Sequence, residues 1–160
     1  MSKSSVLLDS NVLIYSALDH PEFGKRSTRL LINVELKKIE GYIPTIVLNE
    51  TLHRLMIAEV IKNKKVKNVG EALSLLRNVR KTIPELDICW TEINKLFEMN
   101  FIILKEKRNT FLNSLKISKK YSLLARDACI ASFAQDYGIK NIATFDKDFE
   151  RVEFLKIWRP

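Results

Sequence analysis

Glycine, proline and cysteine are all scarce in this chain of 160 residues, with four, four and two copies. The scarcity of glycine and proline excludes fibrous and low-complexity proteins, which are rich in these residues. No apolar run approaches the roughly 18 residues that a membrane-spanning helix needs. Residues 6–8 are apolar, but this stretch is too short for the core of a signal peptide. We therefore expect a compact, cytoplasmic globular protein.

The two cysteines lack the spacing of a zinc site or of a Cys-x-x-Cys redox motif. Cys89 is flanked by Ile88 and Trp90, and Cys129 also has apolar neighbours. Free buried thiols behave as small apolar side chains, and we predict this role for both. A disulfide or redox role is the alternative.

Acidic residues are outnumbered: 27 Lys and Arg stand against 19 Asp and Glu, which gives a formal net charge of +8. The basic residues gather in segments 62–67, 77–81, 105–108 and 116–120. A basic surface attracts polyanions, above all nucleic acids, but basic runs also occur on ordinary solvated helices. Charge alone therefore does not decide for nucleic-acid binding.

No linker, repeat or low-complexity tract divides the sequence, and we expect one domain over residues 1–160. Apolar runs bounded by polar residues predict strands at 6–8, 42–43, 101–104, 141–144 and 153–157. Helical spacing predicts helices at 22–38, 45–61, 69–81, 85–99, 110–119 and 122–137. Strands separated by helices pair in parallel, so the predicted class is α/β with a small parallel sheet.

The sequence also predicts local details of these elements. Ser10 and Asn11 supply capping chemistry for a helix after the first strand. Leu36 is expected on the inner side of the helix over 22–38, and Gly41 is expected to end that helix. The segments 69–81 and 85–99 are expected to form an antiparallel helix pair. Residues 62–67 are expected to form a basic turn.

Two carboxylates follow predicted strands directly. Asp9 comes after the strand over 6–8, and Asp146 comes two residues after Thr144, at the end of the strand over 141–144. The carboxyl ends of parallel strands meet at one edge of a sheet, which is where ligands bind in such folds. Asp9 and Asp146 are therefore expected at the same edge.

Two more acids lie in the interior of predicted helices. Glu50 shares a partly apolar face with Ile46, and Asp127 shares its face with Leu123 and Ile130. Aspartate is a poor residue for a helix interior. A carboxylate buried without a partner costs several kcal/mol, so it normally finds a cation or becomes neutral.

Each of these acids also has an ordinary explanation. Asp9 or Asp127 could cap a helix, Asp146 could be a turn residue, and Glu50 and Asp127 could pair with nearby arginines. Taken together, four acids at strand ends and inward helix faces of a basic protein need a common cation. Carboxylate and water are the ligands that Mg²⁺ and Mn²⁺ prefer. The set therefore favours a metal site.

Four motifs carry a resemblance to a known family. They are Leu-Asp-Ser-Asn-Val-Leu at 8–13, Pro-Thr at 44–45 with Asn-Glu at 49–50, Arg-Asp-Ala-Cys-Ile-Ala at 126–131, and Ala-Thr-Phe-Asp-Lys-Asp-Phe at 143–149. Because the four motifs occur in this order, the sequence resembles the PIN-domain nucleases, and within them the toxin ribonucleases of the VapC type. The resemblance implies a three-layer α/β/α sandwich with a helical protrusion over residues 69–99.

The resemblance also implies roles for individual residues. By position, Asp9, Glu50, Asp127 and Asp146 match the catalytic acids that hold one or two Mg²⁺ or Mn²⁺ ions. Supporting or substrate-binding positions match Asn11, Thr144, Asp148 and Arg126. The two histidines are expected to take no part, with His20 solvated and His53 structural.

The expected activity is hydrolysis of RNA phosphodiester bonds by a metal-activated water. The resemblance implies products with a 5′-phosphate and a 3′-hydroxyl, a cognate antitoxin protein as partner, and a homodimer. Two other functions stay open: a housekeeping PIN nuclease in RNA processing or decay, and a non-catalytic RNA-binding scaffold. The complete set of acids argues against the scaffold.

Overall fold

The computed structural model describes residues 4–63 and 66–160 and contains a five-stranded, wholly parallel sheet. Its strands are β1 (Ser4–Leu8), β2 (Ile39–Pro44), β3 (Ile102–Leu104), β4 (Asn141–Ala143) and β5 (Lys156–Trp158). The sheet order is β3-β2-β1-β4-β5, so β1 lies at the centre between β2 and β4. The predicted α/β class is confirmed, and a strand overlaps each predicted range, although the last begins only at Lys156 because residues 153–154 form a turn.

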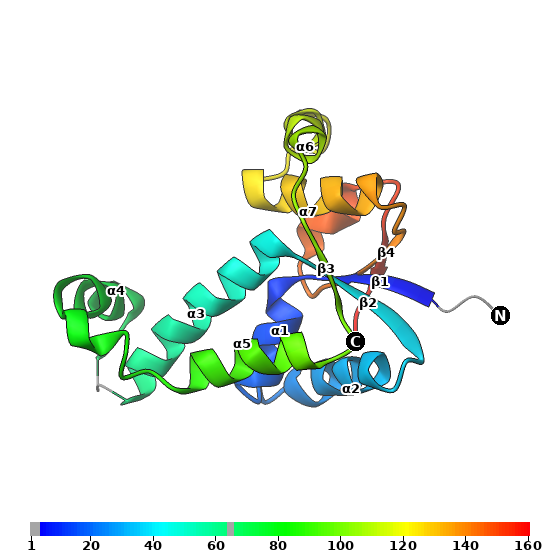
Figure 1. The fold of residues 1–160 in the computed structure, drawn as a ribbon. Coiled ribbons are helices and arrows are strands. Elements are labelled where there is room, and N and C mark those ends of the chain that lie inside the picture. The colour runs from blue at the N-terminus through cyan, green and yellow to red at the C-terminus, as the bar shows by residue number, and fades with distance from the viewer. Residues whose placement is uncertain (1–3, 64–65) are drawn as a thin grey trace.

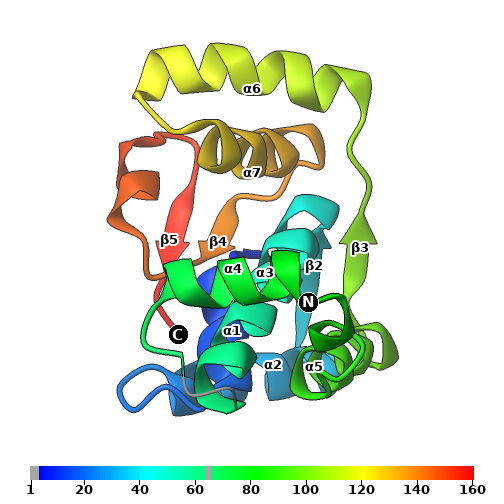
Figure 2. The same ribbon diagram turned by 90° about the vertical axis from the view of Figure 1, so that its left-hand side faces the viewer.

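Helices cover both faces of this sheet, which gives the three layers implied by the motifs (Figure 1). The helices are α1 (Ser10–Ala17), α2 (Gly24–Glu35), α3 (Thr45–Asn63), α4 (Val69–Asn78), α5 (Ile88–Glu98), α6 (Arg108–Tyr121) and α7 (Ala125–Asp136), with the 3-10 turns η1 (Arg80–Thr82) and η2 (Lys147–Arg151). The pair α6 and α7 lies on one face, and α1 and α2 lie on the other (Figures 1 and 2). The main core between the layers includes the fully buried Leu7, Ile43, Phe133 and Phe149.

Gly41 lies inside β2 and does not end a helix, because α2 already ends at Glu35. A Cβ atom at Gly41 would lie 2.8 Å from both the Phe101 ring and the Val34 side chain. The missing side chain therefore lets α2 and the start of β3 close over the strand. Leu36, which was expected inside, is 58% exposed.

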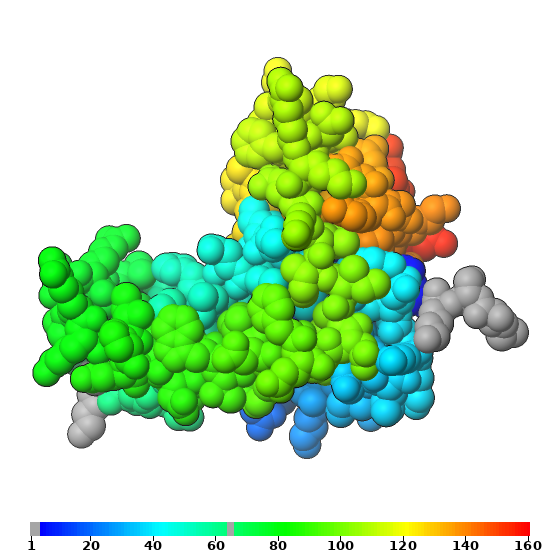
Figure 3. All heavy atoms as spheres, viewed as in Figure 1, coloured from blue at the N-terminus to red at the C-terminus, as the bar shows by residue number. Residues whose placement is uncertain are grey.

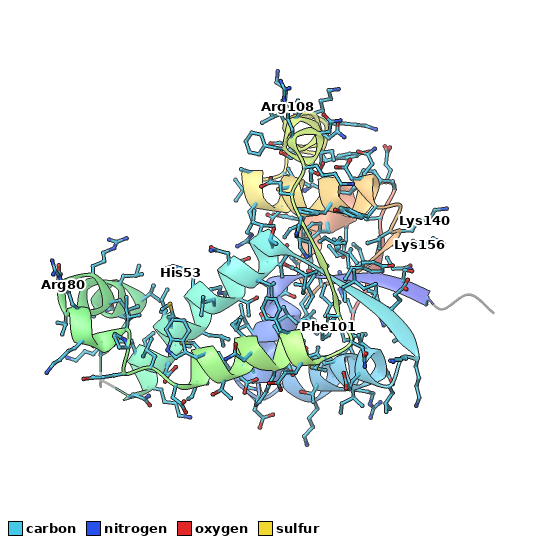
Figure 4. All side chains as sticks on the ribbon, viewed as in Figure 1. His53, Arg80, Phe101, Arg108, Lys140 and Lys156 are labelled. Carbon is cyan, nitrogen blue, oxygen red and sulfur yellow. The ribbon has the colours of Figure 1, made fainter. Side chains whose placement is uncertain are left out.

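The helix α3 runs beyond the sheet and carries α4 and α5, forming an arm with Arg80 near its tip (Figures 1 and 4). The predicted antiparallel pair is wrong: α5 packs along α3, whereas α4 lies across the end of the arm (Figures 1 and 2). A second, smaller core of Leu55, Val60, Ala72, Leu86 and Cys89 holds the arm together. The predicted basic turn over 62–67 begins later than expected, because residues 62–63 still belong to α3, and residues 64–65 lie outside the described residues.

The arm and the α6–α7 layer meet at an angle, and the surface is hollowed between them (Figure 3). The first turns of α3 and α7 and the carboxyl end of β1 adjoin this corner (Figures 1 and 2). Both cysteines are free and buried, as predicted. Among the residues that the structure describes, none of the helices is long and apolar enough to cross a membrane.

Candidate metal centre at the carboxyl edge of the sheet

Asp9 and Asp146 lie at the same edge of the sheet, as predicted from the parallel order of β1 and β4. The two strands are neighbours, with Leu8 paired to Ala143. The backbone N–H of Asp9 donates to the carbonyl oxygen of Ala143 at 3.0 Å, which ties the chain after β1 to the end of β4. The two carboxylates therefore enter one hollow from adjacent strands.

The Asp9 carboxylate is held by three neighbours. Its Oδ1 accepts from Ser10 N at 2.7 Å, so Asp9 itself caps α1, in place of Ser10 or Asn11. Its Oδ2 accepts from Asn11 Nδ2 at 2.8 Å and from Thr144 Oγ1 at 2.7 Å. Thr144 Oγ1 in turn accepts from Asp146 N at 3.0 Å. Asn11 and Thr144 thus fix the orientation of the Asp9 carboxylate, and Thr144 connects it to the backbone of Asp146.

Burial changes the ionisation of Asp9, whose exposed fraction is only 3%. Desolvation raises its pKa from 3.8 to about 6, and the hydrogen bonds from Thr144 and Ser10 oppose this rise. The nearby charge of Glu50 raises the pKa further, while Arg126 lowers it. Burial, more than any neighbouring charge, therefore disfavours the ionised form of Asp9.

Asp127 lies in the first turn of α7, because that helix begins at Ala125 and not at Ser122. The free N–H groups and the dipole of a helix N-terminus favour an acid there, so the unfavourable interior position that was predicted is wrong. Asp127 is nevertheless only 3% exposed. Burial raises its pKa, Arg126 opposes this rise, and the charges of Asp146 and Asp148 add to it.

A single arginine bridges two of the predicted acids. Arg126 NH2 and Nε lie 3.1 and 3.3 Å from Asp127 Oδ1, and Arg126 NH1 contacts Glu50 Oε1. Arg54 NH1 lies 3.9 Å from the same Glu50 oxygen. The ordinary ion-pair partners considered for Glu50 and Asp127 are therefore present, and a metal is not their only source of positive charge.

The remaining carboxylate oxygens still suit a hard divalent cation. One oxygen each from Asp127, Asp146 and Asp148 lie within 4.8 Å of one another. Glu50 Oε2 is buried, with no hydrogen-bond partner within the described residues. Asp148, expected only in a supporting role, thus joins the convergent group, although Arg151 also pairs with it at 2.8 Å. Oxygen ligands of this kind fit Mg²⁺ or Mn²⁺.

The hollow at this edge has a volume of about 230 Å³. It is lined by Asp9, Ser10, Asn11, Tyr15, Arg54, Arg126, Phe145 and Asp146. Sequence reasoning missed the two aromatic rings, although each had a signal. Phe145 stands between two site residues of the last motif, and Tyr15 lies one helical turn after Asn11.

The two histidines had been predicted to lie outside the site, and neither is among the described residues that line the hollow. His53 is exposed on α3 (Figure 4). His20 is not simply solvated as predicted: its ring packs 4.5 Å from Tyr15 and 5.1 Å from Phe23, measured between ring centroids.

Comparison with known proteins agrees with this geometry. The family model for the PIN domain matches residues 6–155. Ribonuclease VapC2 of Methanocaldococcus jannaschii is 34% identical over 159 residues, which cover 98% of this chain and 95% of that protein.

Solved structures share the fold at lower identity. VapC20 of Mycobacterium tuberculosis, a toxin that cleaves the sarcin-ricin loop, superposes with a TM-score of 0.65 at 14% identity, covering 97% of this chain and 99% of that chain. A chain of a toxin-antitoxin complex from Klebsiella pneumoniae gives a TM-score of 0.55 at 16% identity, with coverage of 94% and 95%. The extent of the family match and the identity to VapC2 establish that this chain belongs to the PIN domain family.

Proposed function

We propose that the chain is a Mg²⁺- or Mn²⁺-dependent endoribonuclease of the VapC type and the toxin of a toxin-antitoxin pair. The convergence of Asp127, Asp146 and Asp148 beside the buried Asp9 carries this proposal. A basic chain with a net charge of +8 suits an RNA substrate. The name of its relative VapC2 as a ribonuclease supports the same substrate class.

Each residue of the site has a part in this chemistry. Asp9, Glu50, Asp127 and Asp146 would hold the metal, and Asp148 joins them through its place beside Asp127 and Asp146. When bound, the ion supplies a water of lowered pKa and offsets charge on the phosphate.

Neighbouring side chains orient these acids and the substrate. Asn11 and Thr144 hold Asp9 in one orientation by hydrogen bonds, as outer partners of metal-binding carboxylates do. Arg54 and Arg126 line the same hollow and would bind the phosphates of the RNA backbone.

The metal requirement is tested by incubating total RNA with the purified protein, with Mn²⁺ or Mg²⁺ and with EDTA. We expect cleavage with either ion and none in EDTA, because the proposed mechanism depends on a water whose pKa is lowered by a bound metal. Mapping of the cut ends should show 5′-phosphates and 3′-hydroxyls. Cleavage that continues unchanged after chelation would exclude the metal mechanism.

The toxin assignment is separable from the nuclease assignment. It is supported by the fold shared with a chain of the toxin-antitoxin complex from Klebsiella pneumoniae. A short adjacent gene whose product binds this chain and stops cleavage would support a toxin, and the homodimer implied by the family would be seen by light scattering. Cleavage with no such inhibitor would favour a housekeeping nuclease.

Arg126 gives a further prediction about the metal. Its guanidinium pairs with Glu50 and Asp127, two of the carboxylates that a cation would need. Arg126→Met removes this competing charge, so we expect Mn²⁺ to bind about tenfold more tightly in calorimetry. Binding of RNA in EDTA should weaken, because a phosphate partner is lost.

Arg54→Met is the matched control, since Arg54 lies 3.9 Å from Glu50 and is not paired with Asp127 in the described chain. It should change the Mn²⁺ affinity much less. Unchanged or weaker Mn²⁺ binding in Arg126→Met would show that the arginine does not compete with the metal.

A further inference from the structure

Four aromatic side chains form a group at the mouth of the acidic hollow. Tyr15 belongs to α1, His20 and Phe23 lie between α1 and α2, and Phe145 follows β4. Their centroids are separated by 4.4 Å for Phe23 and Phe145, and by 5.5 Å for both Tyr15–Phe23 and Tyr15–Phe145. The group therefore joins two loops that are far apart in the sequence.

This group is not part of the buried interior. All four residues are partly exposed; among the described residues Tyr15 and Phe23 belong to neither hydrophobic core, whereas Phe145 packs against the edge of the main core. Tyr15 and Phe145 line the same hollow as Asp9 and Asp146. Parts of these aromatic side chains are thus accessible beside the carboxylates, and neither core requires Tyr15 or Phe23 for its packing.

Polar groups with spare bonding capacity accompany the rings. His20 Nδ1 accepts from the backbone N–H groups of Glu22 and Phe23, both at 3.3 Å, which leaves Nε2 to carry the proton in the neutral ring. Neither Nε2 of His20 nor the Tyr15 hydroxyl has a hydrogen-bond partner within residues 4–63 and 66–160. The Arg26 guanidinium carbon lies 5.9 Å from the centroid of Phe145.

We propose that this aromatic group is a nucleobase-binding subsite. It would hold one base of single-stranded RNA next to the phosphate that lies at the acids, so the inference rests on the proposed ribonuclease function. A base has a flat apolar face and polar edges, and these match exposed rings flanked by a free N–H donor and a free hydroxyl. Arg26 adds a cation for the adjoining backbone phosphate.

The chemistry favours a base over an apolar protein segment. The rings lie in the same hollow as Arg54, Arg126 and the carboxylates of Asp9 and Asp146, and a purely apolar partner would remove water from these charges without offering them a hydrogen bond. A nucleotide suits both the charged part and the aromatic part of the hollow. Its phosphate pairs with Arg54 or Arg126, and its base covers the rings. The subsite would therefore set which nucleotide is placed beside the cleaved bond.

The first test uses the unaltered protein and a short oligoribonucleotide in EDTA, where cleavage does not interfere. Each base in turn is replaced by an abasic ribose, and binding is measured by fluorescence anisotropy. We expect the loss of one base to weaken binding about tenfold, and loss of the others to have little effect. Equal affinities across the series would overturn the subsite, because a groove that binds only backbone is indifferent to the bases.

The second test locates the subsite on the protein. In Tyr15→Leu and Phe145→Leu the penalty for the missing base should disappear, whereas Tyr15→Phe should keep it because the ring remains. Tyr121→Leu is the control, since Tyr121 lines a separate hollow with Lys116 and Glu153. Melting temperatures of all variants establish that they are folded.

The outcomes separate the two proposals. If the protein neither binds nor cleaves RNA, both the ribonuclease function and the subsite fail. If it cleaves RNA and the penalty persists in folded Tyr15→Leu and Phe145→Leu, only the subsite fails. If both variants unfold, quenching of a 2-aminopurine base by the unaltered protein decides, since a stacked base is quenched and an unstacked base is not.

Discussion

Asp127→Asn is expected to lower RNA cleavage by about a hundredfold or more without unfolding the protein. The carboxylate is buried, and one of its oxygens lies within 4.8 Å of those of Asp146 and Asp148. The amide has the same shape but no charge, so it binds a divalent cation poorly. It can still accept from Arg126, so the first turn of α7 should keep its structure. The measurement is the initial cleavage rate in saturating Mn²⁺.

Asp87→Asn is the matched control, because Asp87 is exposed on the arm and makes the same change of charge. It should retain full activity. A similar loss of cleavage in both variants would mean that net charge, and not the acidic edge of the sheet, controls the rate. Full activity in Asp127→Asn would remove this residue from the catalytic assignment.

Asp9→Asn should also abolish cleavage, and its stability gives an independent check. The pKa of Asp9 is raised by burial from 3.8 to about 6, so its contribution to stability is full below pH 3.8 and is lost as the pH rises through about 6. The ionised carboxylate then costs the metal-free fold roughly 3 kcal/mol. The measurement is the difference in melting temperature in EDTA, Asp9→Asn minus the unaltered protein. This difference should be larger at pH about 7.5 than at pH about 4.5. A large loss of stability at both pH values would instead assign Asp9 a structural role.

The sheet and its acidic edge could be predicted because both follow from local patterns. A short apolar run followed by Asp9 indicates a buried strand that ends at a polar edge, and the strand before Asp146 repeats this pattern. The arm was harder to predict. Periodicity identifies α4 and α5 but not how they pack, because the crossing of α4 over the end of α3 depends on tertiary contacts. Gly41 was misread for a similar reason, since the need for a missing side chain comes from Phe101, which lies 60 residues away along the chain.

The acids of the candidate site were predicted from the sequence, but the side chains around them were missed. Each acid was conspicuous in the sequence because a carboxylate is out of place beside apolar residues. The bridge from Arg126 to Glu50 was not visible, since it joins two helices that are distant in sequence. The aromatic group was missed although Phe145 and Tyr15 each had a signal, because an aromatic residue in an amphipathic pattern is easily taken for a core residue. Composition and spacing therefore reveal misplaced charges more readily than they reveal exposed rings.

Glu59 was also missed, and it carries the second large prediction. Its side chain on α3 is 3% exposed. Its Oε1 accepts from Asp87 N at 2.7 Å and Ile88 N at 3.1 Å, and its Oε2 accepts from Cys89 N at 2.9 Å. Asp87 precedes α5 but makes no side-chain capping bond within the described chain. Glu59 therefore caps α5 from a neighbouring helix and fixes the arm.

Glu59→Ala is expected to lower the free energy of unfolding by about 3 kcal/mol, because three buried N–H groups lose a charged acceptor. Glu59→Gln should cost less, since its carbonyl oxygen still accepts from two of them. Glu98→Ala, at an exposed position of α5, is the control and should change stability little. Urea unfolding monitored by circular dichroism gives the midpoint and the slope for each variant.

The pH dependence distinguishes this cap from ordinary packing. Burial alone would raise the pKa of Glu59, but the three backbone N–H groups outweigh burial and the pKa is lowered from 4.5. The carboxylate therefore stabilises the fold above pH 4.5, and this contribution is lost as the pH falls through the lower, folded pKa. The stability difference between the unaltered protein and Glu59→Ala should shrink in acid. A difference that stays constant with pH would show that Glu59 acts by filling space, because apolar contacts of its side chain do not depend on its ionisation.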